Sequence, residues 1–220
     1  MMHGHGREGH HDWDARYAAA DRIFPAEPDE ALVELAAGLS PGRALDLGAG
    51  EGRNSLWLAR QGWQVTAVDL SEVGLGRLRA QAAAEGLAVE AVTADMGEFL
   101  ARGGRFDLVV VANIHPAAAE RARLLAAAAQ AVAHGGHLFL TGHHLESLGR
   151  AGPPDPDRLY TEDRLAGAFP GLEVLRIEKR DRQRGDAAAP LVNVVAWAAR
   201  PVPAHGTSKH EGHQDREPSR

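Results

Sequence analysis

Residues 44–52 read Ala-Leu-Asp-Leu-Gly-Ala-Gly-Glu-Gly, a short apolar run that leads into three glycines at alternate positions. A second apolar run, Gln64-Val-Thr-Ala-Val-Asp69, ends in an acidic residue. Short apolar runs predict buried strands, and glycines directly after a strand permit the positive φ angles of a tight strand-to-helix turn. The glycine loop, Gly48 to Gly52, and Asp69 therefore predict a site for a nucleoside cofactor, in which an acidic side chain accepts from the ribose hydroxyls.

The spacing of the glycines distinguishes between cofactors. A dinucleotide-binding loop has two residues between its second and third glycine and places a pyrophosphate at a helix N-terminus. Here one residue separates Gly50 from Gly52, and the carboxylate of Asp46 precedes the loop, where it would repel a pyrophosphate. Asp46 can instead orient the amino and carboxylate ends of an amino-acid-bearing nucleoside, directly or through water and the loop amides. The pattern predicts S-adenosylmethionine as cofactor and disfavours a nicotinamide oxidoreductase.

Four segments carry a resemblance to a known family. In chain order they are Trp13-Asp-Ala-Arg-Tyr17, Gly50-Glu-Gly-Arg-Asn-Ser-Leu-Trp-Leu-Ala59, Asp95-Met96 and Gly152-Pro-Pro-Asp-Pro-Asp-Arg-Leu-Tyr-Thr161. Together they resemble the class I S-adenosylmethionine-dependent methyltransferases, and within them the small bacterial branch that includes the tellurite-resistance and thiopurine methyltransferases. The resemblance covers roughly residues 12–200. It implies a Rossmann-like fold and transfer of a methyl group.

The composition narrows the class of protein. The chain has 220 residues, 44% of them hydrophobic, so we expect one domain over residues 12–200 between disordered tails, a His-rich one over 1–11 and another over 201–220. The net charge is −6 and no Lys/Arg cluster could follow a phosphate backbone, so a nucleic-acid partner is not expected. No apolar run approaches the ~20 residues of a membrane helix. The absence of cysteine excludes disulfides and thiolate metal sites. We expect a cytoplasmic enzyme of unknown oligomeric state.

Strand and helix patterns alternate along the chain. The expected strands are 43–47, 64–69, 88–94, 106–112, 137–141, 173–182 and 191–199, and the expected helices are 54–61, 71–85, 96–101, 117–134 and a short one after Thr161. The last two strands have no helix between them and should pair antiparallel. We predict an α/β fold, a doubly wound, mostly parallel seven-stranded sheet with a terminal antiparallel β-hairpin. Arg121 should point away from the apolar helix face, and residues 143–160 should form a long loop able to act as a lid.

Residues at strand ends are the cofactor candidates, because ligands of a doubly wound sheet bind outside the carboxyl ends of its strands. Asp69 should hold the ribose, while Asp95 and Met96 should meet the adenine; either aspartate could instead only cap a helix. The resemblance implies that Trp13 and Tyr17 cover the cofactor, with core packing as the alternative. The expected cofactor-binding residues are Trp13, Tyr17, Asp46, Gly48, Ala49, Gly50, Gly52, Asn54, Asp69, Leu70, Asp95, Met96 and Asn113.

Candidates for the acceptor side follow the fourth and fifth strands. Asn113-Ile-His-Pro116 resembles the Asn-Pro-Pro-aromatic signature of amino-directed methyltransferases, but it lacks the aromatic residue, which argues against a DNA base or glutamine as acceptor. His115 offers a group that titrates near neutral pH, or it is only a polar residue before a proline. The expected catalytic or acceptor-binding residues are His115, His143, His144 and Tyr160.

Two further features leave alternatives open. The basic run of Lys179, Arg180, Arg182 and Arg184 could steer an anionic acceptor or form a solvated sheet edge. The terminal histidines could bind a transition metal loosely or belong to flexible polar tails, and no defined metal site is predicted. We expect in-line transfer of the sulfonium methyl group to a small-molecule acceptor. The alternative is a non-enzymatic S-adenosylmethionine-binding accessory protein of a stress or metal response.

Overall fold

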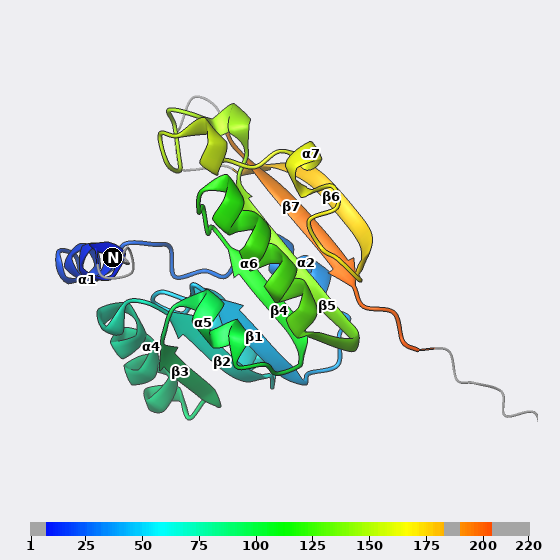
Figure 1. The fold of residues 1–220 in the computed structure, drawn as a ribbon. Helices are drawn as coiled ribbons and strands as arrows, with labels where there is room; N and C mark the ends of the chain where they lie inside the picture. Colours follow the sequence, from blue (N-terminus) through cyan, green and yellow to red (C-terminus); the bar gives the residue numbers. More distant parts are fainter. Residues whose placement is uncertain (1–7, 183–189, 204–220) are drawn as a thin grey trace, which may run out of the picture.

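A single mixed sheet forms the centre of the protein (Figure 1). The computed structural model describes residues 8–182 and 190–203. The strands are β1 (Arg43–Leu47), β2 (Gln64–Asp69), β3 (Val89–Thr93), β4 (Phe106–Ala112), β5 (Val132–His143), β6 (Glu173–Arg182) and β7 (Leu191–Ala199), in the order β3-β2-β1-β4-β5-β7-β6. β1 to β5 pair in parallel, and β7 is antiparallel to both of its neighbours. The predicted seven-stranded, doubly wound fold with a terminal hairpin is confirmed.

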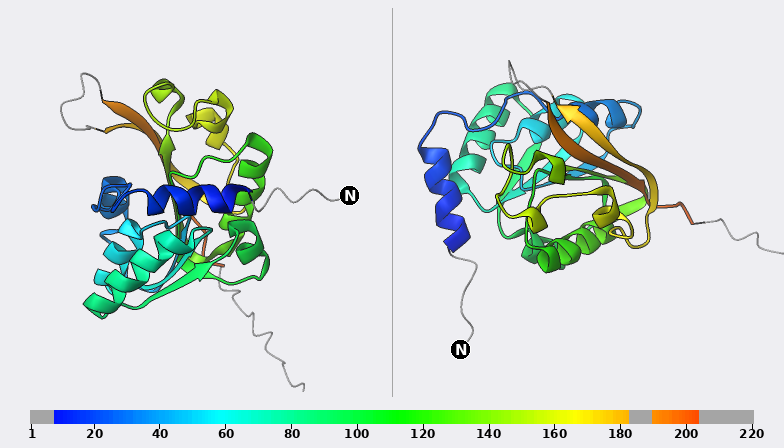
Figure 2. Two further views of the ribbon diagram at one scale, coloured as in Figure 1. Left: turned by 90° about the vertical axis from the view of Figure 1, so that its left-hand side faces the viewer. Right: turned by 90° about the horizontal axis from the view of Figure 1, so that it is seen from above.

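Helices cover both faces of this sheet. They are α1 (Glu8–Ala18), α2 (Glu30–Ala36), α3 (Arg53–Arg60), α4 (Glu72–Glu85), α5 (Met96–Ala101), α6 (Ala118–Ala131) and α7 (Glu162–Leu165), with short 3₁₀ turns at Leu145–Ser147 and Pro156–Arg158. α1 stands outside the layers that cover the sheet (Figure 2). The helix α2, which begins at an Asp29 cap, was not predicted from the sequence. No helix in the described part of the chain is long and apolar enough to cross a membrane.

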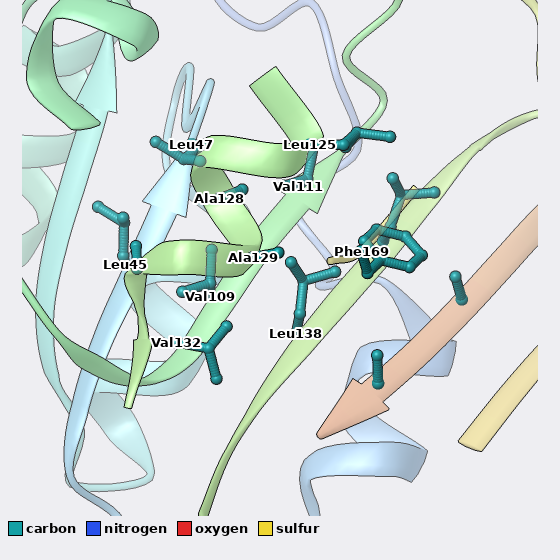
Figure 3. Packing of buried hydrophobic residues seen from close by; sticks show 14 of the residues in the cluster. Leu45, Leu47, Val109, Val111, Leu125, Ala128, Ala129, Val132, Leu138 and Phe169 are labelled. Carbon is teal, nitrogen blue, oxygen red and sulfur yellow. The ribbon is translucent and has the colours of Figure 1, made fainter. Parts of the chain in front are cut away.

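Two apolar clusters, one on each face of the sheet, hold the strands whose ends form the candidate site. On one face, alternate residues of the central strands pack against α6. Figure 3 shows the strand residues Leu45, Leu47, Val109 and Val111 and the helix residues Leu125, Ala128 and Ala129. On the other face, buried residues of β1, β4 and β5 meet α2 and α3, including Ala44, Leu108, Phe139, Leu32 and Leu58. Each fully buried leucine contributes about 1.5–3 kcal/mol. Because β1 and β4 are buried on both faces, their ends are held rigidly.

The structure corrects two expectations about α6. The helix ends at Ala131, before the predicted end at residue 134, because Val132 is fully buried and pairs with Phe106 as the first residue of β5. The glycines that should have ended the helix lie inside that strand. Arg121 does not point away from the core. It is 7% exposed, and its Nη1 donates to the carbonyl of Asp157 at 2.8 Å. Long arginine side chains can bury their stem while the head finds polar partners.

The predicted tails fall mostly outside the described residues. Residues 1–7, 183–189 and 204–220 are not described, and α1 begins at Glu8, inside the stretch expected to be a tail. The terminal histidines His3, His5, His205, His210 and His213, together with Arg184, therefore lie outside the described residues. The limits expected for the domain, residues 12 and 200, remain a prediction.

Candidate active site

The glycine loop adopts a conformation that only glycine accepts readily. Gly48, Gly50 and Gly52 have φ values of 70°, 54° and 81°. A Cβ at these positions would collide with Ile114, Tyr17 and Leu78 respectively. The protein's own side chains therefore fill the space beside each glycine. The loop is locked between β1, α3 and its neighbours, and its backbone shape is set before any ligand arrives.

Asp69 joins the end of β2 to the glycine loop. Its Oδ2 accepts from the Gly50 N–H and its Oδ1 from the Ser71 N–H, both at 2.8 Å. Burial raises the pKa of Asp69, and these backbone hydrogen bonds oppose the rise. The alternative that Asp69 caps α4 is wrong, because the cap is Ser71, whose Oγ accepts from the Gly74 N–H. A carboxylate offers about four lone pairs, so two hydroxyl donors still fit.

Asp95 and Met96 begin α5 beside the loop. Asp95 is the N-cap of this helix, with Oδ1 accepting from the Glu98 N–H at 3.0 Å, so the capping alternative is present in the structure. Its second oxygen has no partner among the described residues, which is compatible with a contact to an exocyclic amine. The sulfur of Met96 lies 3.7 Å from the position of a Cβ on Gly48. Met96 and Ile114 thus form an apolar wall next to the loop.

Asp46 precedes the glycine loop in β1 and Asn54 follows it in α3, and both side chains are buried. Asp46 is 2% exposed and accepts from the Ser55 hydroxyl at 2.6 Å. Burial raises the pKa of Asp46 to about 6, against the opposing effects of that hydrogen bond and of the charge of Arg53. The Oδ1 of Asn54, 3% exposed, accepts from the Asp29 N–H at 2.9 Å. Of the two expected roles of Asp46, its burial favours the indirect one, through the loop.

The N-terminal segment lies on the glycine loop. Tyr17 is 3% exposed and its hydroxyl packs against Gly50. The rings of Trp13, Tyr17 and Phe24 form a cluster with centroid distances of 6.0 to 6.4 Å. Burial raises the pKa of Tyr17 well above its usual range, and the charges of Asp69 and Glu51 add to this effect. The packing of Tyr17 agrees with the core-packing alternative. Contact of Trp13 and Tyr17 with the cofactor stays a prediction.

His115 and His143 lie together at the ends of β4 and β5. Their rings are stacked, with centroids 5.2 Å apart and an interplanar angle of 4°. The Nδ1 of His115 is 3.2 Å from the carbonyl oxygen of Arg158, and its Nε2 accepts from the His143 N–H at 3.4 Å. Burial and then the charge of His143 lower the pKa of His115 to about 4. His115 is therefore neutral at pH 7, with both ring nitrogens engaged.

The other two acceptor-side candidates, His144 and Tyr160, are buried and hydrogen-bonded to neighbouring elements. His144 is 5% exposed; its Nε2 is 3.1 Å from Glu162 Oε2, and its Nδ1 accepts from the Glu146 N–H. Tyr160 is 1% exposed and its hydroxyl donates to the carbonyl of Ile114 at 2.6 Å. Burial raises the pKa of Tyr160 above its usual range. The structure brings His115, His143 and Tyr160 together and turns His144 toward α7.

Asn113 carries an orphaned polar atom at the end of β4. Its φ is 58°, unusual for a residue other than glycine, and its N–H donates to the Thr141 carbonyl at 2.8 Å. Both Asn113 Oδ1 and Thr141 Oγ1 are buried without a hydrogen-bond partner among the described residues. Leaving such an atom unpaired costs about 1–3 kcal/mol. The amide oxygen of Asn113 fits the ammonium group of S-adenosylmethionine, so the residues present fit the expected cofactor.

The basic run of β6 is paired on the surface. Lys179 Nζ lies 2.8 Å from Glu146, and Arg180 contacts Glu34 at 2.7 Å. These pairs favour a solvated edge over a steering patch. The described residues contain no group of three or more His, Asp or Glu that could hold a metal ion.

Comparisons with known proteins agree with this geometry. Residues 44–136 match a family model described as a methyltransferase domain. The ubiquinone biosynthesis O-methyltransferase of Aromatoleum aromaticum is 34% identical over 135 residues, 60% of this chain and 57% of the relative. The ribosomal RNA small subunit methyltransferase C of Alcanivorax borkumensis is 40% identical over 70 residues, 32% of this chain and 21% of the relative. The chain thus spans little more than half of the first relative and about a fifth of the second.

A solved structure supports the fold. TehB from Haemophilus influenzae superposes with a TM-score of 0.66 at 19% identity, covering 87% of this chain and 67% of that one. At this identity the likeness shows the fold alone. The sheet order and the glycine loop agree with the match of residues 44–136 to a methyltransferase domain.

Proposed function

We propose that this protein binds S-adenosylmethionine at the glycine loop and transfers its methyl group to a small-molecule acceptor. The observation that carries the proposal is the joint between Asp69 and Gly50 at the ends of β2 and β1, which fixes the loop beside the orphaned amide of Asn113. Ligands of doubly wound sheets bind at this edge. In the proposal Asp69 accepts from the ribose hydroxyls, Asp95 and Met96 meet the adenine, and Asn113 accepts from the ammonium group.

The demands on the side chains are modest. S-adenosylmethionine supplies a methyl group on a sulfonium, which is an excellent leaving group. The protein therefore has to hold the donor, align the acceptor in line with the sulfur–carbon bond and exclude water. The rigid loop performs the first task, and the aromatic residues Trp13 and Tyr17 contribute to the third. Positioning of this kind supplies several kcal/mol of the reduction in the barrier.

His143 is a better candidate base than His115. The low pKa of His115, about 4, and its two occupied nitrogens make it a poor proton acceptor at neutral pH. The Nδ1 of His143 lies 3.1 Å from the amide oxygen of Asn193, a contact that fits the ring tautomer with its proton on Nδ1. In this proposal His143 accepts the proton of a hydroxyl or amine acceptor. His115 stacks on His143 and holds its orientation.

A small acceptor is supported by two observations. The net charge of −6 disfavours a nucleic-acid backbone, and the ubiquinone biosynthesis relative is named for O-methyl transfer. The ribosomal RNA relative, which matches only 70 residues, makes nucleic acid the competing acceptor. The narrower likeness to the tellurite-resistance and thiopurine branch and the cytoplasmic location stay predictions.

The test is a screen with methyl-labelled S-adenosylmethionine against phenols, thiols, amines, halides, chalcogen oxyanions and ribosomal RNA. We expect label in at least one small acceptor. Transfer to RNA alone would contradict the acceptor class. Tight cofactor binding with no transfer at all would favour the non-enzymatic accessory protein.

A further inference from the structure

A partly buried ion pair joins the glycine loop to helix α4. Glu51, the residue between Gly50 and Gly52, is 5% exposed, and its Oε1 lies 2.7 Å from Nη1 of Arg77. Neither residue was singled out from the sequence, because the two lie 26 positions apart. The available signal was an acidic residue enclosed by the glycines of the loop. A buried charge is stable only if it is fully paired, so this pair is a fixed part of the loop.

The same two side chains hold the N-terminal segment. The Nη2 of Arg77 donates to the carbonyls of Tyr17 and Ala20, each at 2.7 Å. The Oε2 of Glu51 accepts from the Ile23 N–H at 3.1 Å. We call residues 13–24 the cap. The Phe24 N–H donates to the same Glu51 oxygen at 3.4 Å, so one ion pair bonds four backbone groups of the cap to the glycine loop and α4.

A second anchor connects the cap to Asp69. The Oδ1 of Asp14 accepts from the Ser71 hydroxyl at 2.6 Å and from the Val73 N–H at 3.2 Å. The Ser71 N–H in turn donates to Asp69. The cap is thus joined to both parts of the predicted cofactor site, the glycine loop through Glu51 and Asp69 through Ser71.

Apart from these hydrogen bonds, the cap is held by the buried ring of Tyr17 on Gly50 and by contacts of α1 with α4. The residues between α1 and α2 form no regular secondary structure. Arg16 and Arg22 on the cap are exposed, whereas Tyr17 is buried on Gly50. Segments with few apolar contacts open at low free energy.

We propose that Arg77 and Glu51 are positioning residues that couple closure of the cap to the state of the cofactor loop, and so control release of the cofactor product. The inference rests on the proposed function. A cofactor bound at the preformed Gly50-Glu51-Gly52 backbone lies next to the ion pair, and the ion pair holds the cap closed over it. Cap opening then limits the departure of S-adenosylhomocysteine, as lid opening limits product release in many enzymes.

The experiment compares Arg77→Met with Arg79→Met in the full chain. Arg79 lies on the same helix and forms an exposed ion pair with Glu72, so it is a matched control. The dissociation rate of S-adenosylhomocysteine is measured by stopped-flow fluorescence of Trp13, with Trp13→Phe identifying its signal. We expect Arg77→Met to raise this rate at least 10-fold and Arg79→Met to change it less than 2-fold. Equal rates in the two variants would overturn the coupling.

Limited trypsin digestion measures whether the ligand closes the cap, which a purely structural role of Arg77 would not affect. S-adenosylhomocysteine should protect Arg16 and Arg22 from cleavage in the unmodified protein and in Arg79→Met, but not in Arg77→Met. If Arg77→Met does not fold, Glu51→Gln takes its place, with the same expectations. A protein that binds no S-adenosylhomocysteine overturns both this inference and the proposed function. Tight binding without protection overturns only the inference.

Discussion

The donor side and the acceptor side of the site differ in how they are built. The donor side, the glycine loop with Asp69, comes from the ends of two adjacent strands, and its backbone groups are bonded to one another. The acceptor side gathers His115, His143 and Asn193 from distant parts of the chain. Next to it, at the ends of β4 and β5, lie the unpaired atoms of Thr141 and of Asn113, which is proposed to meet the cofactor. A region that is fully satisfied without ligand is preformed, whereas unpaired buried groups mark a place that gives up stability for a ligand.

The largest effect should come from Gly50→Ala on the donor side. The new Cβ would collide with the Tyr17 hydroxyl, and alanine disfavours a φ of 54°. We expect affinity for S-adenosylhomocysteine to fall by two orders of magnitude or more, measured by isothermal titration. Gly76→Ala in α4 is the control, because a Cβ there meets nothing within 4 Å. Unchanged affinity in Gly50→Ala would show that the loop is not preformed.

Replacing His143 and His115 one at a time should show which of the two acts as the base. For a protonated acceptor found in the screen, His143→Ala should lower kcat by roughly 10²–10⁴, as expected when a general base is lost. His115→Ala should lower it much less, because His115 is already neutral with a pKa of about 4. Both variants should retain cofactor affinity. The reverse order of effects would make His115 the base after all.

The donor side and the acceptor side also differ in how well the sequence predicts them. β1, β2, β4 and β7 were predicted at their observed limits, because glycines, acidic residues and prolines flank compact apolar runs. The charged strand β6 was also predicted at its observed limits. The donor side was visible because its residues are consecutive. The Glu51–Arg77 pair and the burial of Arg121 depend on contacts between distant residues, and no local pattern encodes them. The predicted end of α6 is wrong because Gly135 and Gly136, which are typical of a helix end, lie inside β5.

The buried His115 should make stability depend on pH. Its pKa in the folded protein, about 4, lies below its ordinary value of 6.5, so below that value the unfolded chain binds more protons. Stability is thus fully present above about pH 6.5 and falls as the pH drops toward 4, by about 3 kcal/mol. Urea unfolding of the wild type and of His115→Gln between pH 4 and 7 measures this. If the free energy of unfolding depends on pH in the same way in both proteins, this prediction is wrong.

The smallest effect should come from Thr141→Val. The hydroxyl of Thr141 is buried and has no partner among the described residues, so an isosteric methyl group should raise stability by about 1 kcal/mol. The melting temperature of the variant reports this gain. Thr66→Val is the control, since Thr66 Oγ1 donates to Glu90. A loss of stability in Thr141→Val would mean that the hydroxyl is paired in solution.

The central claim is that the donor side binds S-adenosylmethionine and not a dinucleotide. Isothermal titration of the full chain with S-adenosylmethionine, S-adenosylhomocysteine and NAD tests it most directly, with Asp69→Asn beside the wild type. We predict binding of the first two, none of NAD, and a loss of about 1–3 kcal/mol in Asp69→Asn, because a charge-assisted bond to the ribose is removed. Binding of NAD, or no binding of S-adenosylmethionine, would contradict the claim. Unchanged affinity in Asp69→Asn would limit that residue to holding the loop.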